Sequence, residues 1–101
     1  MIIEHDQAIN VLGSNDKIVI DEWTGLKAFI GEDLTKDEND EICLCAYDEI
    51  NEESKLLMTN EQLAKSIYKI ENNIISAHIG DECVFCGRVY IKPQSIDEII
   101  G

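Results

Sequence analysis

The alternation of apolar and polar residues along the chain predicts a substantial β-sheet. Two apolar runs, at 17–23 and 26–30, are joined by Thr24-Gly25 and predict a β-hairpin. A third run, at 42–47, is apolar at successive positions, which is typical of a strand buried on both faces. By the same criteria we expect further strands at 55–58, 74–79 and 83–91, the last two joined by a turn at 80–82.

The clearest helical periodicity follows Thr59. Thr59 and Gln62 have the spacing of a capping box, in which each side chain bonds to the backbone N–H of the other residue. Glu61 and Lys65 stand in the favourable i,i+4 order on the polar side. We therefore predict a principal helix over about residues 60–70, whose apolar stripe consists of Leu63, Ala64, Ile67, Tyr68 and Ile70.

Short helices are predicted near both ends of the chain. One, at 6–12, begins at Asp6, and the other, at 96–100, begins with a capping box of Ser95 and Glu98. No repeat, low-complexity segment or linker divides the chain, and its 101 residues suit a single domain. The expected fold is therefore one α+β domain, with an antiparallel or mixed sheet of about five to six strands covered by one principal helix.

The net charge of −13 restricts the partners of this protein. Twenty-one carboxylates stand against eight lysines and arginines, so the chain is poorly suited to bind a phosphate backbone or an anionic membrane surface. A basic protein would instead be attracted over a distance. No apolar run reaches the roughly 18 residues that cross a bilayer, and the amino end lacks a basic leader region, so we expect a cytoplasmic protein.

Most of this charge lies in one stretch of the sequence. Between Glu32 and Glu53, 22 residues hold ten carboxylates and one lysine, a local charge of −9. Acidic loops can simply keep a small domain soluble. The alternative, which we take as the leading hypothesis, is a non-enzymatic protein whose carboxylates imitate nucleic-acid phosphates on a basic partner. The residues expected to contact that partner are Asp33, Asp37, Glu38, Asp40, Glu41, Asp48, Glu49, Glu52 and Glu53.

In size and composition the chain is similar to two groups of small acidic proteins. One comprises the inhibitors of nucleases and defence effectors that phages and mobile elements encode, and the other comprises immunity proteins that neutralise basic nuclease toxins. No motif carries this likeness, so no family residues are transferred. An inhibitor would also need an aromatic or aliphatic anchor. Trp23, at the expected hairpin turn, is the candidate, the alternative being that its ring packs into the core.

The four cysteines suggest a second hypothesis, a small zinc-stabilised domain. Cys43, Cys45, Cys83 and Cys86 could supply four thiolates, and C-x-x-C at 83–86 is similar to one knuckle of a zinc ribbon. The C-x-C at 43–45 departs from that pattern, and residues three apart on a strand point to opposite faces. We therefore favour reduced cysteines that pack in the core, and expect no metal or cofactor.

A third hypothesis is a small enzyme that uses His78 with a nearby cysteine. His78 alternates with Ser76 on a strand whose other face is apolar, which favours a solvent-facing histidine. Phosphate-binding loops, nucleophile elbows and zinc-protease motifs are absent from the sequence, so those chemistries have no local support. The acidic run at 37–48 also lacks the glycine and final glutamate of a calcium-binding loop. Strands 26–30 or 83–91 could pair across a homodimer if either is an exposed edge.

Overall fold

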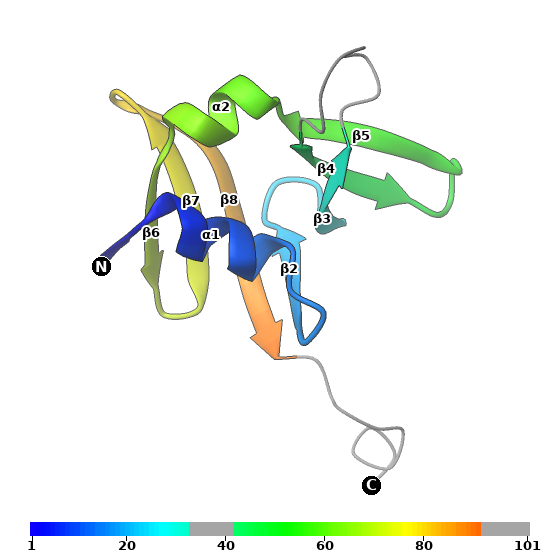
Figure 1. Cartoon of the computed structure of the whole chain (residues 1–101). Helices are drawn as coiled ribbons and strands as arrows, with labels where there is room; N and C mark the ends of the chain where they lie inside the picture. The colour runs from blue at the N-terminus through cyan, green and yellow to red at the C-terminus, as the bar shows by residue number, and fades with distance from the viewer. Residues whose placement is uncertain (33–41, 92–101) are drawn as a thin grey trace, which may run out of the picture.

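The computed structural model describes residues 1–32 and 42–91 (Figure 1). Within these residues the strands form one eight-stranded sheet in the order β1-β6-β7-β8-β2-β3-β4-β5. Each pair of neighbours is antiparallel. The strands are β1 (Ile2–Ile3), β2 (Lys17–Asp21), β3 (Lys27–Glu32), β4 (Ile42–Asp48), β5 (Glu53–Met58), β6 (Ile67–Glu71), β7 (Ile74–Ile79) and β8 (Glu82–Ile91).

The predicted fold class, a five- to six-stranded sheet covered by one principal helix, is wrong. The described residues contain two short helices, α1 (His5–Leu12) and α2 (Asn60–Lys65), of eight and six residues. Two strands were not expected, β1 and β6, and β6 occupies the second half of the predicted helix at 60–70. The helix predicted at 96–100 lies outside the described residues.

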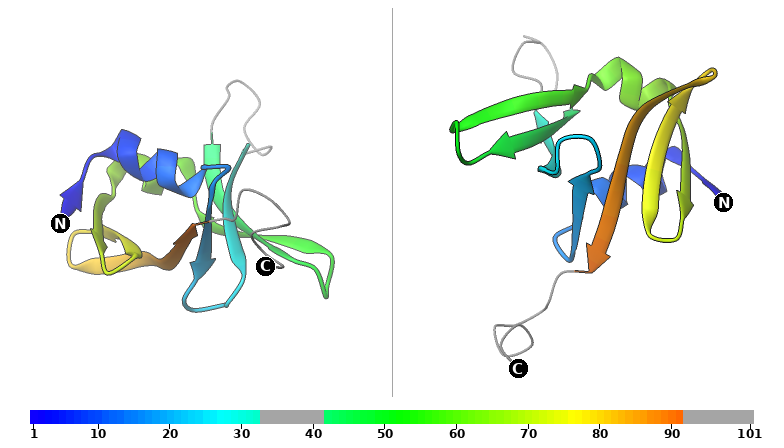
Figure 2. Two further views of the ribbon diagram at one scale, coloured as in Figure 1. Left: turned by 90° about the horizontal axis from the view of Figure 1, so that it is seen from below. Right: turned by 180° about the vertical axis from the view of Figure 1, so that it is seen from behind.

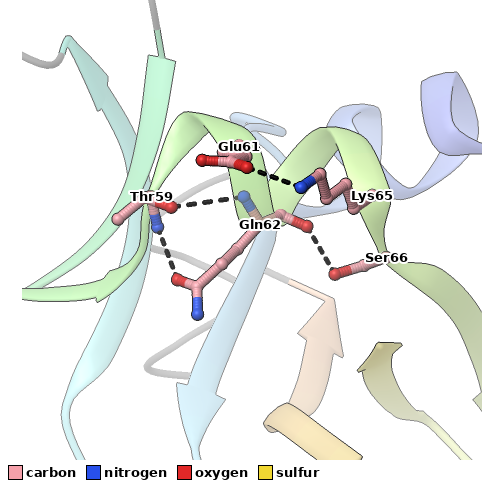
Figure 3. A network of polar contacts seen from close by, with 5 residues as sticks. All are labelled: Thr59, Glu61, Gln62, Lys65 and Ser66. Atoms are coloured by element: carbon pink, nitrogen blue, oxygen red, sulfur yellow. Dashed lines mark hydrogen bonds and ion pairs between the residues drawn. The ribbon is translucent and has the colours of Figure 1, made fainter. Parts of the chain in front are cut away.

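The start of α2 confirms the predicted capping box, which Figure 3 shows. The backbone N–H of Gln62 donates to the Thr59 hydroxyl at 3.2 Å, and the N–H of Thr59 donates to the Gln62 side chain at 2.9 Å. Lys65 and Glu61 form the predicted i,i+4 ion pair at 2.5 Å. The predicted start of the helix is therefore confirmed, and only its predicted end is wrong.

Helix α2 ends at Ser66 because the last carbonyl groups find other partners and the chain joins a sheet. Ser66 adopts an extended backbone, and its hydroxyl donates to the Gln62 carbonyl at 2.6 Å (Figure 3). The phenol of Tyr68 donates to the Leu63 carbonyl, also at 2.6 Å. Strand β6 then pairs with β7 on one side and β1 on the other. β-Branched and aromatic residues such as Ile67 and Tyr68 favour this extended state once partner strands exist.

The other predicted strands are confirmed with small shifts of their ends. Strands β2 and β3 form the expected hairpin, and β7 and β8 form another through a turn with Gly80 at φ +61°. Strand β4 lies between β3 and β5 and has four buried residues. Strands β3 and β8, considered as possible homodimer edges, are both internal, and the edges are β1 and β5.

The core lies on the face of the sheet that carries both helices. Helix α1 contacts β2, β3 and β6, while α2 contacts β4 and β5. The sheet is strongly curled, because β5, at one end of the strand order, also contacts β8. Figure 2 shows the two helices on one side, with the β2–β3 turn and the end of the β4–β5 hairpin extending toward the other. The largest buried side chains are Tyr68, Phe85, Leu44, Met58, Leu63 and Ile75. Among the described residues, neither helix is long or apolar enough to cross a membrane.

The buried phenol of Tyr68 is expected to make the folded protein less stable at alkaline pH. Its burial raises the pKa of the phenol from about 10 to about 12. Because the unfolded chain loses this proton first, the folded state is stabilised below pH 10 and that contribution is lost as the pH rises from 10 to 12. Urea midpoints measured between pH 9 and about 12 should fall less steeply for Tyr68→Phe than for the wild type. The exposed Tyr90→Phe variant is the control, and an unchanged slope in Tyr68→Phe would contradict the assignment.

Candidate binding surface

The structure describes only part of the predicted acidic surface. Those of the β3–β4 connection, Asp33, Asp37, Glu38, Asp40 and Glu41, fall outside the described residues. Of the other four, Asp48 ends β4, Glu49 and Glu52 lie in the turn that follows, and Glu53 begins β5. The described part of the candidate surface is therefore the β4–β5 hairpin.

Asp48 shapes the turn of this hairpin and does not face outward. The side chain is buried, and one carboxylate oxygen accepts from the backbone N–H groups of Ile50 and Asn51 at 2.9 and 3.3 Å. The other oxygen accepts from the Asn51 amide at 2.8 Å. The hydrogen bond from the Asn51 side chain, followed by that from its backbone, lowers the pKa of Asp48. Of the predicted contact residues, Asp48 thus belongs to the scaffold.

The tip of the hairpin carries three exposed carboxylates around an exposed isoleucine. Glu49, Glu52 and Glu53 are all exposed, and Glu52 adopts a left-handed backbone with φ +53°. Ile50, between them, is 92% exposed. Figure 1 shows this hairpin extending away from the rest of the sheet. The end of this projecting element therefore exposes one apolar side chain and three acidic ones within five residues of sequence.

The face of the sheet opposite the helices continues this apolar character along the hairpin. Cys45 pairs with Phe29 on β3 and with Leu56 on β5, so these three side chains form a row across the three strands. Leu56 is exposed, as is Tyr47, two residues further along the same face of β4. Sequence reasoning missed Ile50, Tyr47 and Leu56. An isoleucine inside an acidic turn is the one signal that could have indicated them.

Trp23 lies in the β2–β3 turn and is 61% exposed, so its ring does not pack in the core. The buried carboxylate of Asp21 holds this turn. It accepts from the Trp23 backbone N–H at 3.1 Å and from the Thr24 hydroxyl at 2.7 Å. The turn extends to the same side of the sheet as the tip of the β4–β5 hairpin, away from α1 (Figure 2). Trp23 is therefore exposed, as the predicted anchor would need to be.

The four cysteines lie on two separated strands. Cys43 and Cys45 are on β4 and Cys83 and Cys86 are on β8, and β2 and β3 lie between these strands in the sheet. The described residues contain no group of three histidine, cysteine, aspartate or glutamate side chains placed to hold a metal ion. The four-cysteine zinc hypothesis therefore receives no support from the arrangement.

The expectation that Cys83 and Cys86 point to opposite faces is wrong, because β8 contains a bulge. Ala77 pairs with Phe85 and His78 pairs with Cys83, which leaves Val84 as an extra residue. Cys86 pairs with Ser76. Since Ser76 and His78 lie two apart on β7, both thiols share their face.

A shallow hollow of about 380 Å³ lies on this face of the sheet. It is lined by Ser76, His78, Cys83 and Cys86, together with Lys69 and Glu71. His78 contacts the Ser76 hydroxyl at 2.9 Å instead of a carboxylate that would orient it as a base. The Cys83 thiol donates to the Phe85 carbonyl at 3.4 Å. Burial, followed by the neighbouring Cys83, raises the pKa of Cys86, which makes its thiolate scarcer. This arrangement does not favour the hypothesis of an enzyme using His78 and a cysteine.

Comparison of the chain with family models, curated proteins and solved structures finds no match in any of the three. The β4–β5 hairpin is therefore identified as the candidate surface by its own geometry. Its distinguishing features are its projection, its exposed carboxylates and its exposed apolar side chains.

Proposed function

We propose that this protein is a non-enzymatic binding protein whose β4–β5 hairpin occupies a basic surface of a partner protein. The observation that supports this most directly is the hairpin tip, which exposes Glu49, Glu52 and Glu53 together with Ile50, whose side chain is 92% exposed. The partner would be a nucleic-acid-binding protein, such as a nuclease or a defence effector of the kind that phages and mobile elements inhibit. A basic nuclease toxin, neutralised by an immunity-type protein, would meet the same surface.

The two kinds of side chain at the tip have different roles in this proposal. Exposed ion pairs contribute only about 0–1 kcal/mol each, so carboxylates alone give little affinity. They instead steer a basic partner toward the hairpin and select against acidic ones. Binding energy comes mainly from apolar anchors that become buried, here Ile50, Tyr47 and Leu56. Because Asp48 fixes the turn internally, little conformational entropy is lost when the tip docks.

The proposal predicts how affinity responds to charge and salt. In titrations against purified basic nucleases and other basic nucleic-acid-binding proteins, the partner should bind more weakly as ionic strength rises. The triple variant Glu49→Gln, Glu52→Gln, Glu53→Gln should weaken binding on the order of tenfold and flatten the salt dependence. The matched control is Asp6→Asn, Asp81→Asn, Glu82→Gln, which makes the same change in charge at exposed positions elsewhere.

A second variant separates steering from anchoring. Ile50→Ala should weaken binding while leaving the salt dependence as in the wild type, because it removes apolar contact and no charge. Duplex DNA should compete with the protein for the partner if the carboxylates occupy a nucleic-acid groove. Equal effects of the two triple variants, or affinity that does not change with salt, would refute a role for the acidic tip.

A further inference from the structure

The thiols of Cys43 and Cys45 lie in contact on β4. Their sulfur atoms are 3.3 Å apart, closer than two non-bonded sulfurs usually approach, and both side chains point to the face opposite the helices. Cys43 is buried, whereas Cys45 is only partly buried and can be reached by a small molecule. This pair is distinct from the acidic tip, and although Cys45 lies opposite Leu56, the proposed binding role does not use either thiol.

We infer that Cys43 and Cys45 form a reversible disulfide, so that β4 carries a redox modification site that reacts with small disulfides such as oxidised glutathione. An S–S bond is about 2.05 Å long, so the two sulfurs need to approach by only about 1.3 Å. Neither a strand exchange nor a movement of the helices is required, because both residues belong to one strand.

The reaction is a two-step exchange. The thiolate of Cys45, the accessible residue, attacks one sulfur of the small disulfide and releases one thiolate, leaving a mixed disulfide on Cys45. Cys43 then loses its proton and attacks the Cys45 sulfur, which forms the Cys43–Cys45 bond and releases the second small thiolate. Two protein thiols are oxidised, one small disulfide is reduced to two thiols, and no other reactant is needed.

The backbone indicates why this disulfide is reversible. Residues two apart on an extended strand have Cα atoms about 6.6–6.8 Å apart, at the upper end of the range that a disulfide spans. Closing the bond therefore shortens β4 locally, and strained disulfides are reduced more easily than structural ones. The sheet can absorb this change, because the pairing of β4 with β5 is already irregular here. Leu44 pairs with Met58 and Cys45 with Leu56, which leaves Leu57 without an opposite residue.

The second thiol pair provides an internal comparison. Cys83 and Cys86 share a face of β8 because of the bulge, but the Cys83 thiol is engaged with the Phe85 carbonyl at 3.4 Å. The two cysteine pairs are therefore expected to differ in how readily they oxidise. If contact between the sulfur atoms decides reactivity, oxidation takes place on β4, and the double variant Cys83→Ser, Cys86→Ser reacts like the wild type.

The test uses the reduced full-length chain in buffers with increasing ratios of oxidised to reduced glutathione. Mass spectrometry should show a loss of two hydrogens per chain, located in the proteolytic peptide that contains both Cys43 and Cys45. Cys45→Ser should abolish this loss, whereas the Cys83/Cys86 double variant should retain it in full. Returning the wild type to excess reduced glutathione should restore the original mass.

Peptide mapping of the wild type decides the outcome even if a variant folds poorly. The inference is overturned if the loss of two hydrogens maps to the peptide with Cys83 and Cys86, or if only glutathione adducts form. It is also overturned if no oxidation takes place at ratios that oxidise free dithiols. Far-UV circular dichroism of Cys45→Ser confirms that lost oxidation reflects the missing thiol and not unfolding.

Discussion

Replacement of Phe85 by alanine is expected to lower the free energy of unfolding by about 3–5 kcal/mol. Phe85 is almost completely buried on β8, on the helix-covered face of the sheet. Its ring lies over Gly87, where an added Cβ would come within 2.8 Å of the ring and within 2.7 Å of Val19. The site is thus closely packed, and neighbouring side chains held by the sheet cannot collapse into the space that alanine would leave.

The effect of Phe85→Ala can be measured by urea denaturation, followed by circular dichroism. Domains of this size have a total stability of about 5–15 kcal/mol, so this loss is a large share of the total. Phe29→Ala is the matched control, since Phe29 is only partly buried and lies on the opposite face. Its cost should be clearly smaller. Similar losses for the two variants would mean that the helix-covered face is not the main core.

Asp21→Ala is expected to destabilise the protein by about 2–3 kcal/mol, although aspartate is usually a surface residue. Asp21 has no exposed surface and bonds to the backbone of Trp23 and to the hydroxyl of Thr24. Hydrogen bonds to a charged group are worth about 1.5–3 kcal/mol, and alanine would leave both donors without this partner. The β2–β3 turn, which presents Trp23, would lose the group that organises it.

The control for Asp21→Ala is the neighbouring Glu22→Ala. Glu22 is exposed and pairs with Arg88 at 3.0 Å, a surface ion pair worth at most about 1 kcal/mol. Urea denaturation of both variants should therefore give a much larger loss for Asp21. Asp21→Asn, which keeps an acceptor oxygen, should lie between the wild type and alanine. Equal losses for Asp21→Ala and Glu22→Ala would show that the buried hydrogen bonds are not decisive.

The segment 60–71 illustrates how far the sequence could predict this fold. The capping box of Thr59 and Gln62 was correct because it depends on residues three apart. The predicted continuation to residue 70 was wrong because Tyr68 suits both patterns: it is apolar on a helical stripe and also inward-facing on a strand. Pairing of β6 with β1 and β7 makes this segment a strand instead of a helix. Strand β1 is distant along the chain and β7 comes after the segment, so the residues of 60–70 alone do not indicate this pairing.

The candidate surface was also predictable only in part, because some of its features depend on local sequence and others on the folded structure. The concentration of carboxylates around β4 and the position of Trp23 in a turn follow from the sequence alone. The burial of Asp48, by contrast, depends on a local turn geometry that no pattern specified, and its hydrogen bonds to Ile50 and Asn51 remove it from the surface. The exposure of Ile50 follows from the projection of the hairpin, which is a property of the assembled sheet.

Interactions between residues close in the sequence specify the hairpins at β2–β3 and β7–β8, the apolar β4 and the start of α2, and composition specifies the sign of the charge. The strand order, the extra strands β1 and β6 and the bulge at Val84 that brings Cys83 and Cys86 to one face arise only when separate segments of the chain pack together. Turns and caps depend on neighbours a few residues away. Strand pairing instead depends on hydrogen bonds and side-chain contacts between segments that are far apart in the sequence.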